Sequence, residues 1–388
     1  MGERVQKAKL SMERRGYEAL LIYGDNKLVG NLRYLTDYFP DRAGWISLGP
    51  TQTYMFEGAL LVLTLCDEPS LLLDPGLMAG KEICTKRILR GEGLSTQGGQ
   101  GLSARNIADI LTKAQVHGRV GVEGWDRFPI PLYLGLRELV PEIQLERSTV
   151  VEELRMIKSP MEIEIFRRAG KVGDLAHSAF VENLKRGVGR SELEIVRAAE
   201  QVMRSADPIY EDSCMHSPAL IYSGQPVGDS LLNLPSHVKK IRNGDVVHWD
   251  IGMRHEGYTI DTSRTKVVGT PTEMQSSVYD TTLEMMRKVV SAAKPGIAAC
   301  ELVEIADKVA KESGHELWLR FLGHGTGLDA HERPDMGVEN TRLASNMVLA
   351  IEPRIALGVS SLIGVEDMVL ITENGGEPLI SFEKSLEL

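Results

Sequence analysis

The stretch VVHWDIGMRHEGYTIDTSRTKVVG, residues 246–269, contains two strand-like runs that each carry a carboxylate. Residues 245–252 and 258–268 are rich in Val, Ile, Trp, Tyr and Thr, the residues that favour buried strands. Asp250 lies inside the first run and Asp261 inside the second. Because an isolated ionised carboxylate is costly to bury, we expect a cationic group to compensate these two side chains.

Three more polar residues lie among strand-like apolar neighbours further along the chain: His324 in GHGTGLDAHERP, Glu352 in VLAIEP and Glu366 in GVEDMVLIT. Four carboxylates and one imidazole suit divalent ions such as Mn, Co, Fe or Zn. Five side chains suffice for two ions if carboxylates bridge them, and two ions about 3.5 to 4 Å apart hold a hydroxide and polarise a carbonyl. The set therefore predicts a metal-dependent hydrolase, whereas a single such carboxylate is more often a hydrogen-bonded structural group.

The order of helical and strand-like patterns predicts two domains. Up to about residue 150 a helical pattern (5–15) is followed by strand-like runs (19–23, 59–65 and 70–73), which is typical of an α/β domain. Capping-box sequences then begin helices at Ser159 and Ser191, and further helices are expected over residues 272–293 and 300–313. We therefore expect an α/β domain over residues 1–152 and an α+β domain over residues 153–388.

Composition and charge restrict the partners of this protein. Its 54 acidic residues exceed its 44 Lys and Arg residues, and the net charge of −10 disfavours nucleic acid and anionic lipid surfaces. The 4 cysteines are scattered, and the first residues lack the apolar segment of a signal peptide. The longest apolar run, residues 59–66, is far shorter than the ~20 residues that span a bilayer. We expect a soluble cytoplasmic protein that binds neither nucleic acid nor membranes.

In combination, these motifs resemble those of the pita-bread metallopeptidases, the superfamily of methionine aminopeptidase, aminopeptidase P, prolidase and the metal-free creatinase. The resemblance implies a C-terminal domain with a curved antiparallel sheet, preceded by a smaller creatinase-like α/β domain. The matching stretches are residues 223–252, DTSRT (261–265), GHGTGLDAHERP (323–334), AIEP (350–353) and GVED (364–367), together with the weaker matches at 153–169 and NLRYLTDY (31–38).

The resemblance also implies roles for individual residues. His237 and His331 match positions that face the substrate and stabilise the tetrahedral intermediate, and Glu352 would also carry the proton from the attacking water to the leaving nitrogen. The implied metal ligands are Asp250 on one ion, His324 and Glu352 on the other, and Asp261 and Glu366 bridging both.

The sequence departs from the pattern of prolidases and related Xaa-Pro enzymes at two places. They typically carry Gly after the Glu-Pro of the fourth motif and Arg two residues before the last Glu, where this chain has Arg354 and Gly364. Because that family arginine recognises substrate, its absence weakens the prediction of a strict Xaa-Pro dipeptidase. Arg354 and Arg333 are candidates to replace it, and the alternative is that both are solvated surface arginines.

Arg42 falls near the position where creatinase-like members place an arginine that reaches the neighbouring subunit's site. That arrangement would require a homodimer and would favour an anionic or zwitterionic substrate, because Arg binds carboxylates through two parallel hydrogen bonds. A surface salt bridge with a neighbouring aspartate is the alternative role for Arg42.

The leading functional prediction is a dinuclear metallohydrolase, with manganese among the candidate ions, that cleaves a peptide or peptide-like C–N bond of a small substrate, as Xaa-Pro aminopeptidases and dipeptidases do. One alternative on the same fold is a creatinase-like or ectoine-hydrolase-like enzyme acting on an amidine or amide. Another is a lyase acting on a small zwitterion, which Gly252 disfavours because the lyase branch tends to carry an acidic residue there. A non-catalytic binding module is the least favoured, since all five ligand positions are retained.

Overall fold

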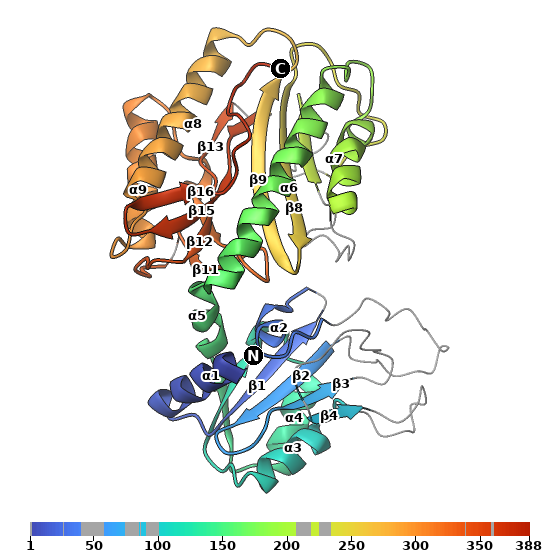
Figure 1. Ribbon diagram of the computed structural model, residues 1–388, viewed down its shortest axis with the longest axis vertical. Helices are drawn as coiled ribbons and strands as arrows, with labels where there is room; N and C mark the ends of the chain where they lie inside the picture. Colours follow the sequence, from blue (N-terminus) through green and yellow to red (C-terminus); the bar gives the residue numbers. More distant parts are fainter. Residues whose placement is uncertain are drawn as a thin grey trace. The chain divides into compact units, whose positions relative to one another are not determined.

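The computed structural model describes the chain except for residues 1, 26, 40–57, 74–84, 86, 91–100, 207–218, 225–233, 338 and 358–360. The described residues divide into two compact units, Met1–Arg155 and Met156–Leu388, called here the N-terminal and the C-terminal unit (Figure 1). The domain boundary expected after residue 152 stays a prediction. Among the described residues, no helix is both long enough and apolar enough to cross a membrane.

The N-terminal unit is built on a mixed sheet with the strand order β4-β3-β2-β1-β5-β6. Strand β1 pairs antiparallel with β2 and parallel with β5, as a mixed α/β sheet requires. The strands are β1 (Ala19–Asp25), β2 (Gly58–Thr64), β3 (Ser70–Leu73), β4 (Arg87–Arg90), β5 (Arg119–Glu123) and β6 (Gln144–Arg147). The helices are α1 (Gly2–Arg15), α2 (Gly30–Thr36), α3 (Ala104–Lys113), the 3₁₀ helix η1 (Trp125–Arg127), α4 (Ile130–Leu139) and α5 (Val150–Met156).

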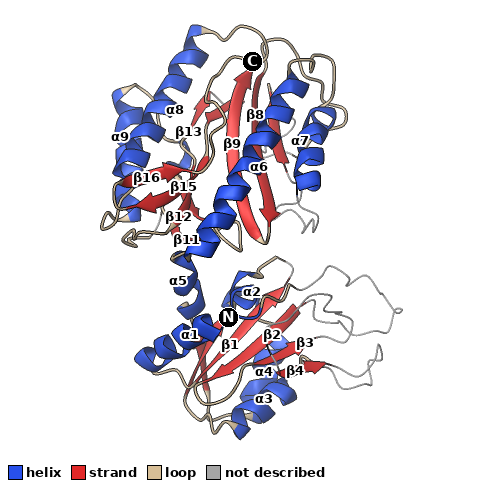
Figure 2. Cartoon of the chain, in the orientation of Figure 1, coloured by secondary structure: helices blue, strands red, loops and turns tan. Residues whose placement is uncertain are grey.

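The C-terminal unit consists of antiparallel strands flanked by helices. Helix α6 lies beside β9 and β8, and α7 lies beside α6 and β7, whereas α8 lies beside β16 and β14, and α9 lies beside α8 (Figure 2). The helices are α6 (Pro160–Leu184), α7 (Glu192–Ala206), α8 (Glu273–Ala292), α9 (Ala299–Glu312) and the 3₁₀ helix η2 (Trp318–Arg320). The strands are β7 (Ala219–Ser223), β8 (Val246–His255), β9 (Tyr258–Val267), β10 (Gly323–Gly325), β11 (Glu332–Asp335), β12 (Val348–Ile351), β13 (Arg354–Leu357), β14 (Ser361–Gly364), β15 (Asp367–Thr372) and β16 (Gly375–Pro378).

The strands of the C-terminal unit form three sheets: β7-β8-β9, β11-β10-β12-β15-β16 and the pair β13-β14. The first two sheets meet at an isolated bridge between Ser263 on β9 and Glu366 just before β15. The predicted capping boxes are present, since Ser159 and Ser191 each accept a hydrogen bond from the backbone N–H three residues later. The predicted strands and helices of this unit are thus confirmed in outline.

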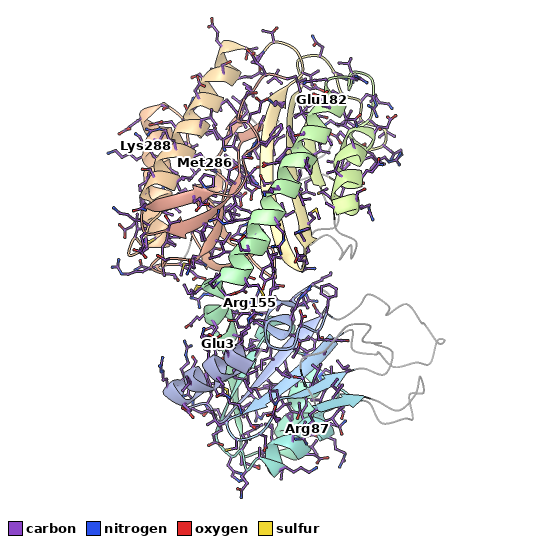
Figure 3. All side chains as sticks on the ribbon, in the orientation of Figure 1. Glu3, Arg87, Arg155, Glu182, Met286 and Lys288 are labelled. Atoms are coloured by element: carbon purple, nitrogen blue, oxygen red, sulfur yellow. The ribbon has the colours of Figure 1, made fainter. Side chains whose placement is uncertain are left out.

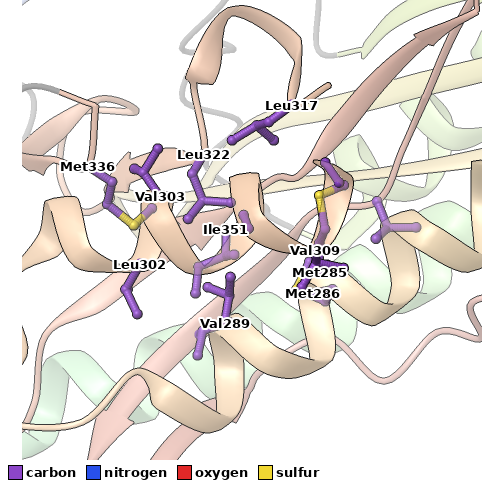
Figure 4. Packing of buried hydrophobic residues seen from close by; sticks show 14 of the residues in the cluster. Met285, Met286, Val289, Leu302, Val303, Val309, Leu317, Leu322, Met336 and Ile351 are labelled. Carbon is purple, nitrogen blue, oxygen red and sulfur yellow. The ribbon is translucent and has the colours of Figure 1, made fainter. Parts of the chain in front are cut away.

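Helices α8 and α9 bury their apolar faces in the core of the C-terminal unit (Figure 4). Met285, Met286 and Val289 of α8 pack with Leu302 of α9 and Ile351 of β12. Lys288, close to Met286 in sequence, is exposed on the opposite side of the helix (Figure 3). This division between apolar and polar faces follows the helical period of the sequence.

Glu123, at the end of β5 in the N-terminal unit, is fully buried among hydrogen-bond donors. Its carboxylate accepts hydrogen bonds from Asn31 Nδ2 at 3.1 Å, from Ser148 Oγ at 2.7 Å and from the Val151 N–H at 3.1 Å. Arg155 in turn donates to Asn31 Oδ1 at 2.6 Å. The network ties α2 and the start of α5 to the sheet, and burial raises the pKa of Glu123 to about 7.

We predict that replacing Glu123 with Gln reduces the loss of stability as the pH rises from about 5 to about 8. Because the folded-state pKa lies above the usual 4.5, the folded state holds the extra proton, and stability falls as the pH rises from about 4.5 through about 7. Between about pH 5 and about pH 8 the unfolding free energy of Glu123→Gln should fall by up to about 3 kcal/mol less than that of the wild type. Urea unfolding at the two pH values measures this, and equal pH dependence in both proteins would contradict it. The exposed Glu138→Gln is the matched control.

Candidate metal centre

Three of the five predicted metal ligands project from one face of the strands around β9. Asp250 on β8 pairs with Ser263 on β9, and Asp261 lies two residues before Ser263, so both carboxylates project from the same face. The isolated bridge between Ser263 and Glu366 brings the third carboxylate to the same place. The alternation of the pleat therefore explains why these residues, far apart in sequence, converge.

The remaining two predicted ligands lie on the neighbouring sheet. His324 on β10 pairs with Ala350 on β12, and Glu352 follows directly after β12. The Nε2 atom of His324 lies 3.4 Å from Glu352 Oε1 and 3.7 Å from Asp261 Oδ2. Its Nδ1 lies 2.9 Å from the Gly325 carbonyl oxygen, which only accepts, so Nδ1 carries the proton in the neutral ring and Nε2 keeps its lone pair toward the carboxylates.

The five residues form two overlapping triads, in each of which the ligand atoms lie within 4.8 Å of one another. Glu366 belongs to both triads, and all five side chains are buried. A third group combines Asp261 and His324 with His331, whose ring centroid lies 4.0 Å from that of His324. The two triads are Asp250, Asp261 and Glu366, and His324, Glu352 and Glu366.

The chemistry of this donor set fits divalent ions. Within the described part of the chain, Asp250 Oδ1 and Glu366 Oε2 are buried and make no hydrogen bond. Buried carboxylate oxygens without a donor are costly unless a cation compensates them. Oxygen-rich sites with one imidazole suit Mn, Co, Fe or Zn, so the residues present could hold such ions.

The carboxylates also shift one another's proton affinities. Burial raises the pKa of Asp250 to about 6 and raises those of Asp261 and Glu366 well above the usual carboxyl range. Burial alone would lower the pKa of His324, but the hydrogen bond to Glu352 and the charge of Asp261 raise it to about 9. Burial opposes ionisation of Glu352 as well, and the Arg354 guanidinium and His324 nevertheless lower the pKa of that carboxyl.

The other predicted site residues lie in different surroundings. Arg354 is buried against the triads, so the alternative of a solvated surface arginine is wrong for this residue. Arg333 pairs through Nε with both carboxylate oxygens of Glu339 at 3.0 Å. His237 is exposed in the segment before β8, and Arg42 lies outside the described residues.

A hydrogen-bonded chain on the other face of β8 and β9 was not predicted from the sequence. Trp249 Nε1 donates to His177 Nδ1 at 2.9 Å, so His177 Nε2 carries the proton toward Thr262 Oγ1 at 3.1 Å. The Thr262 hydroxyl donates to the Glu366 carbonyl oxygen at 2.7 Å. Trp249 and Thr262 directly adjoin two predicted ligands, Asp250 and Asp261. The series of hydrogen bonds therefore holds the segments of these two residues and of Glu366 in place. In the sequence, His177 is indistinguishable from a core residue of its helix.

The fold and this site together define a pita-bread metallopeptidase. The chain belongs to metallopeptidase family M24, whose model matches residues 164–373, and a creatinase/prolidase N-terminal domain model matches residues 4–157. It is therefore a metallohydrolase of a family that uses divalent metal ions.

Several known proteins are similar to this chain over most of its length. A Xaa-Pro dipeptidase of Pyrococcus furiosus is 36% identical over 285 residues, which cover 72% of this chain and 78% of that protein. The structure of the prolidase from Pyrococcus horikoshii OT3 matches with a TM-score of 0.79 at 27% identity and covers 99% of both chains. The prolidase structure from Pyrococcus furiosus matches with a TM-score of 0.77 at 28% identity, covering 97% of this chain and 100% of that one.

We predict that the increase in melting temperature caused by Mn²⁺ is larger at about pH 8 than at about pH 6, and that the two increases differ by about 5 °C or more. Because the folded-state pKa values of Asp250, Asp261 and Glu366 are raised, the metal-free fold loses stability as the pH rises, and fewer protons compete with the ion. Thermal unfolding with and without Mn²⁺ at both pH values measures the difference.

Two matched variants control this measurement. Asp250→Asn should abolish most of the Mn²⁺-induced shift, whereas Asp280→Asn, at an exposed position of α8, should keep it. A shift of the same size in both variants would contradict the placement of the ion at this cluster.

Proposed function

We propose that this protein is a dinuclear metal-dependent peptidase that hydrolyses the amide bond before proline in small peptides. The observation that carries the proposal is the pair of buried triads that share Glu366. The names of the similar proteins, Xaa-Pro dipeptidase and prolidase, support the choice of substrate. When bound, two divalent ions would supply a water that ionises near neutral pH and would polarise the scissile carbonyl.

The proposed division of ligands between the two ions follows the sequence resemblance, and the two triads support Glu366 as a shared ligand. Asp250 would bind one ion, His324 and Glu352 the other, and Asp261 and Glu366 both; the grouping of Asp261 with His324 supports its part in this division. His324 suits this role because its Nδ1 proton is held by the Gly325 carbonyl and Nε2 faces the carboxylates. The preference for Mn, Co, Fe or Zn, the homodimer and the cytoplasmic location belong to the same proposal and rest on the sequence resemblance.

Glu352 is the proposed proton carrier. Its lowered pKa keeps the carboxylate ionised at neutral pH, so it can accept a proton from the attacking water and deliver it to the leaving nitrogen. It stays close to the reacting atoms because its Oε1 contacts the His324 ring while its Oε2 contacts the Arg354 guanidinium.

His331 is the proposed donor to the oxygen of the tetrahedral intermediate. His331 is exposed at its surface, but partial removal of the ring from water and the neighbouring His324 lower its pKa to about 4, so the ring is neutral at neutral pH and keeps one N–H. The ring lies beside His324 and belongs to a group with Asp261, which places it at the edge of the triads. A neutral donor preset toward developing negative charge stabilises that charge without reorganisation. His237 is proposed as a second substrate-facing imidazole on the sequence resemblance alone.

The proposal predicts hydrolysis of Xaa-Pro dipeptides by protein loaded with Mn²⁺ or Co²⁺ and loss of that activity on chelation. Glu352→Gln should lower kcat by about 10²- to 10⁴-fold, because the proton carrier is lost. The exposed Glu373→Gln should retain wild-type kcat. Ninhydrin detection of released proline measures the rates, and elemental analysis should find close to two divalent ions per chain.

Several outcomes would contradict the proposal. Fully loaded protein that cleaves neither Xaa-Pro dipeptides nor Xaa-Pro-Yaa tripeptides would remove the proposed substrate. Metal-free protein that hydrolyses a small amidine such as creatine would favour the creatinase-like alternative. A Glu352→Gln variant that binds metal and keeps wild-type kcat would remove the proton carrier from the mechanism.

A further inference from the structure

The short ladder β13-β14 places Arg354 directly opposite Gly364. Residues paired in an antiparallel ladder project their side chains from the same face, with Cβ atoms about 5 Å apart. A Cβ atom added at Gly364 would lie 2.6 Å from Arg354 Cγ and 3.2 Å from the Pro353 carbonyl oxygen. A contact under 3.0 Å would force one of the two side chains to shift. The cross-strand pair of residues 354 and 364, called here the rung, therefore has room for one long side chain.

Arg354 uses that room to place its guanidinium among three of the proposed ligands. Nη2 lies 3.2 Å from Asp250 Oδ2 and 3.6 Å from Glu366 Oε2, and it also contacts Glu352 Oε2. The side chain of Arg354 is only 6% exposed. By holding Oδ2 of Asp250, the guanidinium leaves Oδ1 of that carboxylate directed elsewhere, and Oδ1 has no hydrogen-bond partner within the described residues.

We propose that Arg354 is a positioning residue of the metal centre and that Arg354 and Gly364 form an exchangeable pair. The centre requires one guanidinium opposite one glycine on this rung, and either strand can supply it. Residues 354 and 364 are also the two places where the sequence departs from the Xaa-Pro pattern, so the two departures amount to one exchange across the ladder. The inference deepens the proposed function and rests on the proposed metal centre.

Electrostatics explains why a guanidinium is needed at this place. Four carboxylates that meet in a buried space repel one another, and a fixed cation holds their oxygens in defined directions before an ion arrives. Groups that orient metal ligands in this way typically change metal affinity by 10- to 100-fold when they are removed. An arginine at 364 would start from the same face of the same rung, so its guanidinium would reach the same carboxylates.

The test compares the Mn²⁺ affinity of four proteins by titration calorimetry. Arg354→Gly should bind Mn²⁺ at least about tenfold more weakly than the wild type. The exchange variant, Arg354→Gly with Gly364→Arg, should restore the affinity to within about threefold. Arg320→Gly is the matched control, because it removes an exposed guanidinium paired with Asp307 and Glu304 and should leave the affinity unchanged.

A fifth protein, the variant Gly364→Arg, tests the space between residues 354 and 364 without reference to metal. Gly364→Arg alone puts two arginines on one rung, so its melting temperature should fall below that of both the wild type and the exchange variant. A melting temperature equal to that of the wild type would overturn the steric part of the inference.

The Mn²⁺ affinities test the positioning role of Arg354 and the exchange between residues 354 and 364. Arg354→Gly that binds Mn²⁺ as well as the wild type, or more tightly, would overturn the positioning role, because tighter binding means that the arginine only competes with the ion. An exchange variant that is unfolded, or folded but no better than Arg354→Gly, would overturn the exchange. Absence of Mn²⁺ binding by the wild type would instead overturn the proposed metal centre, so the two failures are distinguishable.

Discussion

The mutual repulsion of four buried carboxylates is the constraint on which the C-terminal unit depends. Asp250, Asp261, Glu352 and Glu366 meet within a few ångströms in a space that water does not screen. Such a cluster persists only if rigid elements hold it and cations offset it. The antiparallel ladders and the hydrogen-bonded chain through His177 supply the rigidity. In the metal-free protein, Arg354 offsets part of this negative charge. The raised pKa values of Asp250 and Glu366 mean that bound protons offset another part.

The N-terminal unit solves the burial of a carboxylate differently. Glu123 stands alone among three hydrogen-bond donors from surrounding segments, and because burial still raises its pKa to about 7, a proton can neutralise it without any ion. Four carboxyl groups in contact also repel one another, and neutral donors cannot offset that repulsion. Buried carboxylates therefore have different roles in the two units. The single one in the N-terminal unit belongs to a structural hydrogen-bond network, whereas the four in the C-terminal unit form a candidate metal centre.

The sequence was informative where polar residues interrupt apolar strands. Asp250 and Asp261 could be singled out because their neighbours have to be buried, and the ladder β8-β9 then brings the two carboxylates to one face. Arg354 could not be placed, since its surroundings depend on the pairing of β13 with β14, two short strands with no marked period. His177 gave no signal either, because a histidine on the apolar face of a helix looks the same whether it is a filler or a hydrogen-bonded link. In the N-terminal unit, α3, α4 and the strands after residue 73 were likewise not singled out.

The single rung that joins residues 354 and 364 also limits the evolutionary paths open to this sequence. Going from an arginine on one strand to an arginine on the other requires two changes, and each intermediate has a defect: either two arginines crowd one rung or two glycines leave the carboxylates without their cation. Under the proposed exchange, a sequence with the alternative arrangement is two substitutions away from this chain, and neither substitution alone keeps both the space and the charge. A position-by-position alignment scores such a pair as two losses, although the spatial arrangement of charge is retained.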